Sequence, residues 1–208
     1  MQTTPIASAG QTYDGSAVDG SLYVKVVDAA HGAPSWLDGL ISAYSTYGLA
    51  VFAVLMLAGW WHARRQDARR AVKALTAPIL TMIAFAVSTV LKQAVHEVRP
   101  CRSLHVITLE ACPAPGDWSF PSNHATLAAA AAVALWFVSV RLGVIASLCA
   151  LVMAASRVWV GAHYPHDVIA GLTVGALVSA SLALLLARHT TAAAEKITRG
   201  RLRPLVVS

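Results

Sequence analysis

Long uncharged apolar runs dominate the chain. A helix that crosses a bilayer needs about 20 predominantly apolar residues, with a range of about 17–25. Runs of this kind lie at residues 40–61, 74–91 and 168–187. Because backbone amides inside a bilayer have no water to bond with, each run is expected to be a helix. The pattern therefore predicts an all-α integral membrane protein.

A fourth apolar stretch, residues 123–156, is too long for one crossing. It is interrupted by Arg141 and Gly143, and we interpret it as two helices joined by a tight turn at residues 140–143. The total is then five transmembrane helices. In the last of them, small residues recur at a spacing of four: Gly171, Gly175 and Ser179. Such spacing favours close packing between helices.

Composition agrees with a membrane protein. Of the 208 residues, 57% are hydrophobic and 12% are charged, against about 25% charged in an average soluble domain. Lys and Arg number 16 and Asp and Glu 10, giving a net charge of +6. A nucleic-acid partner is not expected, because a soluble binder of that kind does not need long apolar runs. The positive charge therefore points to membrane topology or to an anionic substrate.

The basic residues sort to the two faces of a five-helix bundle. Eleven follow spans one, three and five: Arg64, Arg65, Arg69, Arg70, Lys73, Arg141, Arg188, Lys196, Arg199, Arg201 and Arg203. The positive-inside rule makes this face cytoplasmic, with the N-terminus outside and the C-terminus inside. We predict a disordered tail at 1–20, a single membrane domain at 21–190 and a basic cytoplasmic tail at 191–208. Residues 21–30 are expected to form a short interfacial helix or an irregular lead-in.

Five basic residues remain on the outer face: Lys25, Lys92, Arg99, Arg102 and Arg157. Positive charge is disfavoured on this face, and an anionic substrate is the simplest reason for it. Anchoring to lipid headgroups is the alternative. Lys92 and Arg99, seven residues apart, would share one face of a helix that continues as far as Pro100.

Two histidines and a carboxylate on the outer face supply reactive groups. His124 opens the third span, and His163 precedes the fifth, with Asp167 four residues later. An Asp can hold the ring N–H of a His and leave the other nitrogen free to attack, while a second His protonates the leaving oxygen. Helix N-termini on the same face favour anions. With three cations, this set predicts phosphoryl transfer at the outer face.

Three segments resemble the signature of the type 2 phosphatidic acid phosphatase superfamily. They read K-x6-R-P from Lys92 to Pro100, P-S-N-H at residues 121–124, and S-R-x5-H-x3-D from Ser156 to Asp167. The resemblance implies a membrane phosphatase that uses no metal and no cofactor. Its partners would be the bilayer and a phosphorylated lipid. The oligomeric state does not follow from it.

The resemblance also implies a role for each residue. His163 would form a phosphohistidine, Asp167 would orient it, and His124 would protonate the leaving group and then help to activate water. The phosphate would be held by Lys92, Arg99, Ser122, Asn123 and Arg157. Asn123 stands where the family usually has Gly. Because Asn tolerates left-handed backbone better than most residues, the turn is expected to survive.

Within the superfamily, the lead-in before the first span and residues 158–165 resemble the bacitracin-resistance type of undecaprenyl-diphosphatase. This implies hydrolysis of undecaprenyl or decaprenyl diphosphate to the monophosphate, outside the plasma membrane, which recycles the lipid carrier of cell-wall peptidoglycan. Phosphatidic acid, phosphatidylglycerophosphate and prenyl-sugar phosphates are alternative substrates. An anionic-lipid binder or transporter is a third hypothesis, although transport usually needs a polar path at mid-membrane.

Some neighbouring residues have two readings each. His96 could contact a diphosphate, and Glu97 could pair with Arg99 or Arg102, but a hydrated helix end explains both equally well. His166 is interpreted as a bystander that points away from Asp167.

The outer loop also holds two cysteines, Cys101 and Cys112. The compartment outside the membrane permits a disulfide between them, and two free thiols are the alternative.

Overall fold

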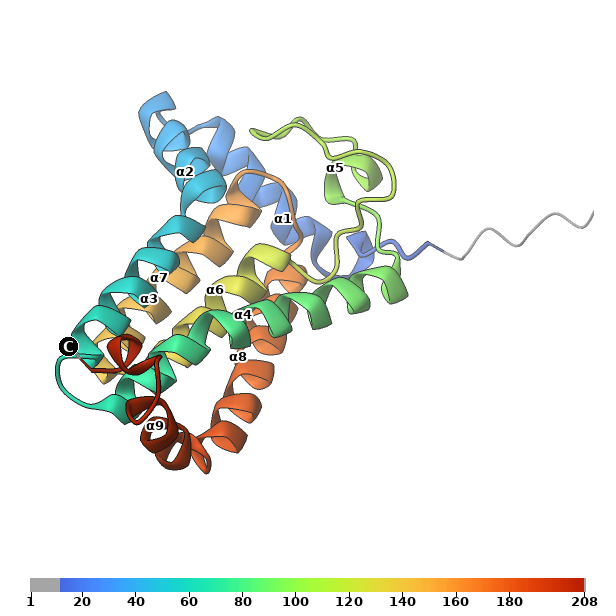
Figure 1. Ribbon diagram of the computed structural model, residues 1–208. Coiled ribbons are helices and arrows are strands. Elements are labelled where there is room, and N and C mark those ends of the chain that lie inside the picture. Colours follow the sequence, from blue (N-terminus) through green and yellow to red (C-terminus); the bar gives the residue numbers. More distant parts are fainter. Residues whose placement is uncertain (1–11, 208) are drawn as a thin grey trace, which may run out of the picture.

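The computed structural model describes residues 12–207, and helices account for its regular structure in this range. In chain order they are α1 (Ser16–His31), α2 (Ser35–Tyr47), α3 (Leu49–Ala63), α4 (Ala68–Val95), α5 (Pro100–Ser103), α6 (Asn123–Trp136), α7 (Val140–Trp159), α8 (Pro165–Ala187), α9 (Thr190–Thr198) and a 3-10 turn, η1 (Arg203–Leu205). Figure 1 shows α6 in the middle of the bundle, among α4, α7 and α8. The predicted all-α class is confirmed for the described residues.

Three of the described helices, α4, α7 and α8, are long and apolar enough to cross a membrane. Helices α2 and α3 qualify only as a pair, bent by 56° at their junction. At 14 residues, α6 covers about 21 Å, short of the roughly 30 Å of bilayer hydrocarbon. Length and composition thus support three or four spans. The count of five stays a prediction.

Small residues bring α6 and α8 into close contact. A Cβ added at Gly175 would lie 2.2 Å from the carbonyl oxygen of Thr126, and Gly171 makes a similar approach to the same helix. Ser179 Oγ donates to the Ala130 carbonyl at 2.9 Å. Because a side chain at either glycine would overlap backbone, the close packing predicted from the four-residue spacing is confirmed. The contact fixes the starts of α6 and α8 side by side.

The turn between α6 and α7 lies earlier than expected. Helix α6 ends at Trp136 and α7 begins at Val140, so residues 137–139 form the turn. The predicted turn at 140–143 is therefore wrong. Gly143 is instead a packing position, because a Cβ there would lie 2.4 Å from the Trp136 ring.

Helix α1 begins inside the segment predicted as a disordered tail. Residues 1–11 lie outside the described range, but Ser16 starts the helix by donating its backbone N–H to Asp14 Oδ1 at 2.9 Å. Tyr23 is fully buried and its hydroxyl donates to the Gly161 carbonyl at 2.9 Å. The tail prediction is thus wrong from Ser16 onward, because polar contacts dock this helix onto the bundle. Of the two readings for residues 21–30, the helix is present.

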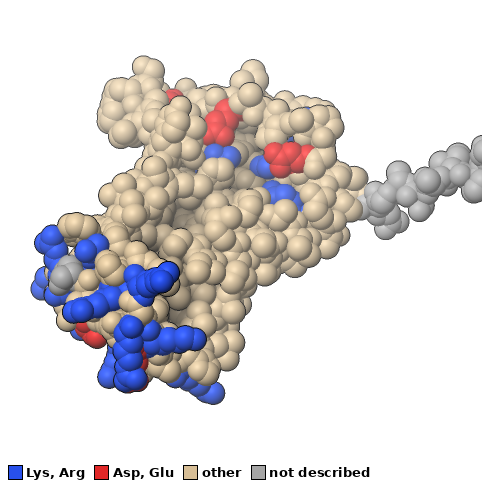
Figure 2. All heavy atoms as spheres, viewed as in Figure 1, with Lys and Arg blue, Asp and Glu red and all other residues tan. Residues whose placement is uncertain are grey.

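Basic side chains gather at two ends of the bundle. Figure 2 shows a dense group of Lys and Arg at the end near α9, and a smaller group beside Asp and Glu in a recess at the other end. Ala63, Val138 and Val206 pack into one cluster, which places the three basic segments at the same end. The predicted separation of the charges is therefore present. The assignment of the α9 end to the cytoplasm stays a prediction.

Candidate active site

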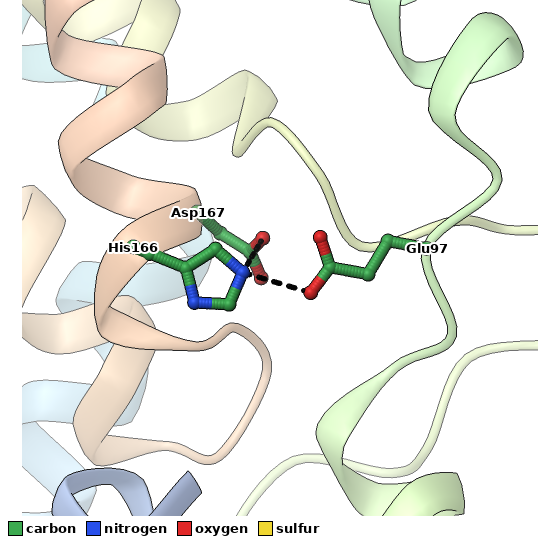
Figure 3. Close-up of side chains that lie close together, drawn as sticks. All are labelled: Glu97, His166 and Asp167. Carbon is green, nitrogen blue, oxygen red and sulfur yellow. Dashed lines mark hydrogen bonds and ion pairs between the residues drawn. The ribbon is translucent and has the colours of Figure 1, made fainter. Parts of the chain in front are cut away.

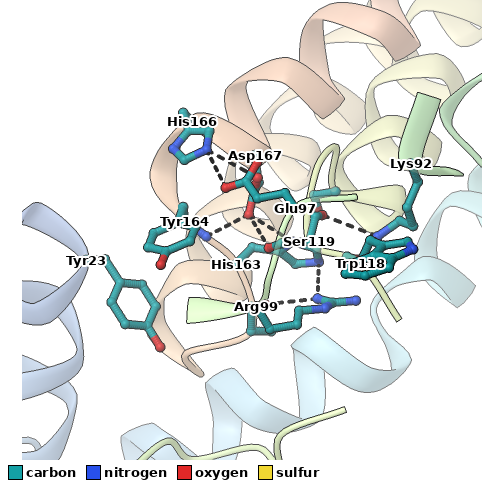
Figure 4. Close-up of polar contacts among 12 residues, drawn as sticks. Tyr23, Lys92, Glu97, Arg99, Trp118, Ser119, His163, Tyr164, His166 and Asp167 are labelled. Atoms are coloured by element: carbon teal, nitrogen blue, oxygen red, sulfur yellow. Dashed lines mark hydrogen bonds and ion pairs between the residues drawn. The ribbon is translucent and has the colours of Figure 1, made fainter. Parts of the chain in front are cut away.

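His163 lies between a carboxylate and a guanidinium just before α8. Its Nδ1 is 3.4 Å from Asp167 Oδ2, and its Nε2 is 3.0 Å from Arg99 Nη1 (Figure 4). A guanidinium can only donate hydrogen bonds, so Nε2 carries the lone pair and the ring proton sits on Nδ1, facing the carboxylate. Burial, with the charge of Arg99 next in importance, holds the pKa of His163 well below its usual range. The ring is therefore neutral at pH 7.

The local chain holds this carboxylate in place. Pro165 begins α8, and Asp167 in its first turn accepts hydrogen bonds from the Tyr164 backbone N–H at 2.9 Å and from the Ser119 hydroxyl. Gly161 has a φ of +81°, a left-handed value that lets the chain turn sharply between α7 and α8. The capped helix start and the tight turn together fix His163 relative to Asp167.

The structure brings the three predicted cations to this histidine. Lys92, Arg99 and Arg157 come from α4, the start of α5 and the end of α7, and each is at most 7% exposed. All three, with His124, are close enough for their charges to act on His163. His124 is half-buried in the first turn of α6. Positive charge is therefore concentrated around the unprotonated Nε2 of His163.

The route by which Lys92 and Arg99 meet differs from the prediction. Helix α4 ends at Val95, and His96 follows in a left-handed conformation with a φ of 53°. The two cations therefore do not share a face of one continuous helix, and Pro100 begins α5 instead of ending α4. They converge because the chain folds back after His96.

In this structure, the cations hold the acidic loop between α5 and α6, residues 104–122, which is called the outer loop after its predicted side of the membrane. Arg99 donates to the Asp117 carbonyl at 3.0 Å and to its Oδ1 at 2.8 Å, and Arg157 Nη1 lies 3.1 Å from both carboxylate oxygens of Glu110. Lys92 Nζ donates to two backbone carbonyls of the same loop, at 2.6 and 3.2 Å. The carboxylates thus occupy donors that a phosphate would need. The sequence did not predict this role, although Glu110 and Asp117 are visible between Arg99 and Arg157.

We expect Asp117→Asn to tighten the binding of inorganic phosphate several-fold. The amide oxygen can still accept from Arg99, but the competing negative charge is gone, and like charges near a shared cation repel. Competitive inhibition by phosphate measures the change. Asp28→Asn on the exposed face of α1 is the matched control. An unchanged or weaker inhibition constant in Asp117→Asn would contradict this competition.

Ser122 and Asn123 stand at the start of α6, where the Ser122 backbone N–H donates to the Asp167 carbonyl at 3.1 Å. Their side chains differ in hydrogen bonding. Ser122 Oγ is buried and has no hydrogen-bond partner among residues 12–207, so its hydroxyl is free to bind an anion. Asn123 Oδ1 accepts from Ser88 Oγ of α4 at 2.7 Å. Its backbone is helical, so the expected need for a left-handed residue at this position is wrong. Gly is not required there because Asn123 is the first residue of α6.

Cys101 and Cys112 form a disulfide, with their Cα atoms 6.0 Å apart. It closes the outer loop between α5 and Asp117. The Arg102 guanidinium bonds to the Pro113 carbonyl in the same loop. Both links keep the acidic loop over the cations.

His96 and Glu97 follow the end of α4 and contact different parts of the structure. The His96 ring packs against Trp118, with centroids 4.8 Å apart. Glu97 is fully buried and lies 2.9 Å from His166 Nε2 rather than beside either nearby arginine. Both interpretations of Glu97, pairing with an arginine and a hydrated helix end, are therefore wrong, because α4 ends before Glu97 and the chain turns toward α8. The bystander interpretation of His166 is also wrong.

Glu97, His166 and Asp167 present ligand-type atoms within 4.8 Å of one another (Figure 3). That spacing would admit a metal ion. However, both ring nitrogens of His166 already lie within 2.9 Å of carboxylate oxygens. This pattern favours a charged imidazole over a metal-bound one.

Comparisons with known proteins place this site in a family. Residues 73–192 match the sequence model of the PAP2 superfamily. The chain is 30% identical over 157 residues to undecaprenyl-diphosphatase BcrC of Bacillus subtilis (strain 168), covering 74% of this chain and 79% of that one. It is 34% identical over 114 residues to decaprenylphosphoryl-5-phosphoribose phosphatase of Mycobacterium tuberculosis (strain H37Rv), covering 54% and 60%.

A solved structure shares the fold. The crystal structure of a PAP2 type phosphatidylglycerolphosphate phosphatase from Bacillus subtilis superposes with a TM-score of 0.55 at 21% identity, covering 88% of this chain and 89% of that one. The region matched to the family contains both histidines and all three cations of the site. The chain therefore belongs to the PAP2 superfamily and is a membrane lipid phosphatase.

Proposed function

We propose that the protein hydrolyses polyprenyl diphosphate, undecaprenyl or decaprenyl, to the monophosphate and inorganic phosphate. This proposal rests on the position of the His163 ring. Its unprotonated Nε2 faces buried cations, and its Nδ1 faces Asp167. The similarity to BcrC over most of both chains supports a diphosphate substrate. The product would be the lipid carrier of cell-wall synthesis.

The reaction would proceed through a phosphohistidine. His163 Nε2 attacks the terminal phosphorus, and the bond to the bridging oxygen breaks as His124 donates a proton to that oxygen. Water, activated by His124, then cleaves the phosphorus–nitrogen bond and releases phosphate. Lys92, Arg99 and Arg157 stabilise the charge that spreads over the phosphoryl oxygens. The chain's own residues thus supply nucleophile, acid and charge stabilisation.

We place the site outside the plasma membrane. The arginines and lysines at the α9 end favour a cytoplasmic position for that end, and the active-site recess lies at the opposite end (Figure 2). The disulfide of the outer loop is compatible with an oxidising compartment. Five spans with the N-terminus outside complete the proposed topology.

A second substrate class has its own support. The similarity to decaprenylphosphoryl-5-phosphoribose phosphatase covers about half of this chain and favours a prenyl-sugar phosphate. Phosphatidic acid and phosphatidylglycerophosphate would use the same groups. These substrates differ from a diphosphate in the leaving group, which is an alcohol instead of a phosphate.

Purified protein in detergent with EDTA tests the proposal. Phosphate release is compared across undecaprenyl diphosphate, a prenyl-sugar phosphate, phosphatidic acid and phosphatidylglycerophosphate, with mixtures to obtain competing specificity constants. The proposal expects the highest kcat/KM for the diphosphate. A higher value for a monoester would overturn the diphosphate assignment, and loss of all activity in EDTA would overturn the metal-free mechanism.

A further inference from the structure

His166 is a half-buried side chain next to the proposed catalytic carboxylate. Its Nε2 lies 2.9 Å from Glu97 Oε1 (Figure 3 and Figure 4). Its Nδ1 lies 2.7 Å from Asp19 Oδ1. An ionised carboxylate accepts hydrogen bonds and cannot donate them. Both ring nitrogens therefore carry protons, and the imidazole bears a positive charge.

Three separate segments hold the ring of His166 in one orientation. Asp19 in α1 also accepts the backbone N–H of His166 at 2.7 Å, at a point where α1 departs from helical geometry. The ring stacks on Tyr164, with centroids 5.3 Å apart and planes at 15°, and on Phe120. Gly15 covers the cluster so closely that a Cβ there would lie 1.9 Å from Glu97 Oε1. An ordinary surface histidine would not be fixed from so many sides.

The ring sits between two buried carboxylates. Glu97 and Asp167 are both fully buried, and each has one oxygen without a hydrogen-bond partner among residues 12–207, Glu97 Oε2 and Asp167 Oδ1. Burial and a second negative charge both disfavour ionisation of a carboxyl group. His166 Nε2 is 2.9 Å from the Glu97 oxygen and 3.6 Å from Asp167 Oδ1. Its charge therefore offsets the repulsion between the two.

We propose that His166, held by Glu97 and Asp19, is a positioning residue that keeps Asp167 ionised. An ionised Asp167 holds the His163 proton on Nδ1 and leaves the lone pair on Nε2, whereas a protonated one would not. This inference rests on the proposed nucleophilic role of His163.

The groups that face Asp167 come from several elements. They are Lys92 of α4, Glu97 of the segment after α4, Ser119 of the outer loop, His163 and Tyr164 of the loop before α8, and His166 itself. Lys92 adds positive charge from the opposite side, so Asp167 is not supported by His166 alone. The expected effect of removing His166 is thus a shift in pH dependence, with activity retained at high pH.

The proposal is tested by the pH profile of kcat/KM. The profile is measured over about pH 5–8 for the wild type, His166→Gln, Glu97→Gln and the double variant. Loss of the imidazolium makes Asp167 harder to ionise, so the acid limb of His166→Gln should move up by about one pH unit or more. Glu97→Gln removes the repelling charge and should move the limb down. The double variant should return toward wild type, with KM changed less than kcat.

Several outcomes would overturn the inference. These are an acid limb that stays in place in Glu97→Gln, a loss in His166→Gln that is equal at every pH, or a double variant that fails to recover. His31→Gln, on the exposed end of α1, is the matched control. If His166→Gln does not fold, Glu97→Gln still decides through its opposite shift. Full activity of a His163 variant would instead defeat the proposed function, so the two failures are distinguishable.

Discussion

His163→Asn is expected to lower kcat by about 10⁴-fold or more on every substrate of the enzyme. The Asn side-chain amide can replace the Nδ1–H group that faces Asp167, so packing and the hydrogen bond are retained. It has no counterpart of Nε2, so no phosphoryl-enzyme can form. The remaining rate would reflect charge stabilisation by the cations alone.

The measurement pairs turnover with binding. Phosphate release gives the loss in kcat, and competition by phosphate or vanadate reports whether the cation cluster is intact. His105→Asn is a suitable control, because His105 is exposed and has a φ of 52°, which Asn tolerates well. Turnover of His163→Asn within tenfold of wild type would exclude His163 as the nucleophile.

The sequence predicted which residues form the active site better than it predicted how the backbone brings them together. The four-residue spacing of His163 and Asp167 on a capped helix start is a local feature, and local spacing determines their contact. The charges of Lys92 and Arg99 were equally readable. The convergence of these two side chains depends on the left-handed backbone conformation of His96, where α4 ends. Gly is the residue that usually indicates such a conformation, so the His at this position did not predict it.

Residues that act across long sequence separations were not predictable in this way. Asp117 and Glu110 gain their roles only when the disulfide-closed loop folds over the arginines. His166 contacts Asp19, which lies 147 positions earlier in the chain. A helical wheel places His166 away from Asp167, but it contains no information about a carboxylate supplied by α1. The roles of these residues depend on tertiary contacts, which the periodicity of the sequence does not show.

The span count shows a similar limit. Apolar length located α4, α7 and α8, because each of these helices is long and apolar enough to cross a membrane. Helix α6 is also apolar, but it is shorter, and alanines such as Ala128 and Ala131 are buried against neighbouring helices. A buried core helix and a membrane-spanning helix have the same composition, and hydropathy alone does not separate them.

His124→Gln is expected to impair monoester substrates far more than the diphosphate. An alcohol leaving group has a pKa near that of water, about 16, and requires a proton as the bond breaks. A phosphate leaving group has a pKa of about 6, so its departure depends far less on the proton that His124 donates. General acid catalysis contributes about 10²–10⁴-fold, so the loss should approach 10⁴-fold for phosphatidic acid and stay near 10²-fold for undecaprenyl diphosphate.

The same variant should separate the two half-reactions. With the diphosphate, attack by His163 continues, but water activation also needs His124, so the phosphohistidine should accumulate to about one equivalent before turnover slows. Rapid acid-free quenching and detection of labelled protein measure this burst. His189→Gln, exposed between α8 and α9, is the control and should show no burst. Equal losses on both substrate classes, without an accumulated intermediate, would mean that His124 binds phosphate and does not transfer the proton.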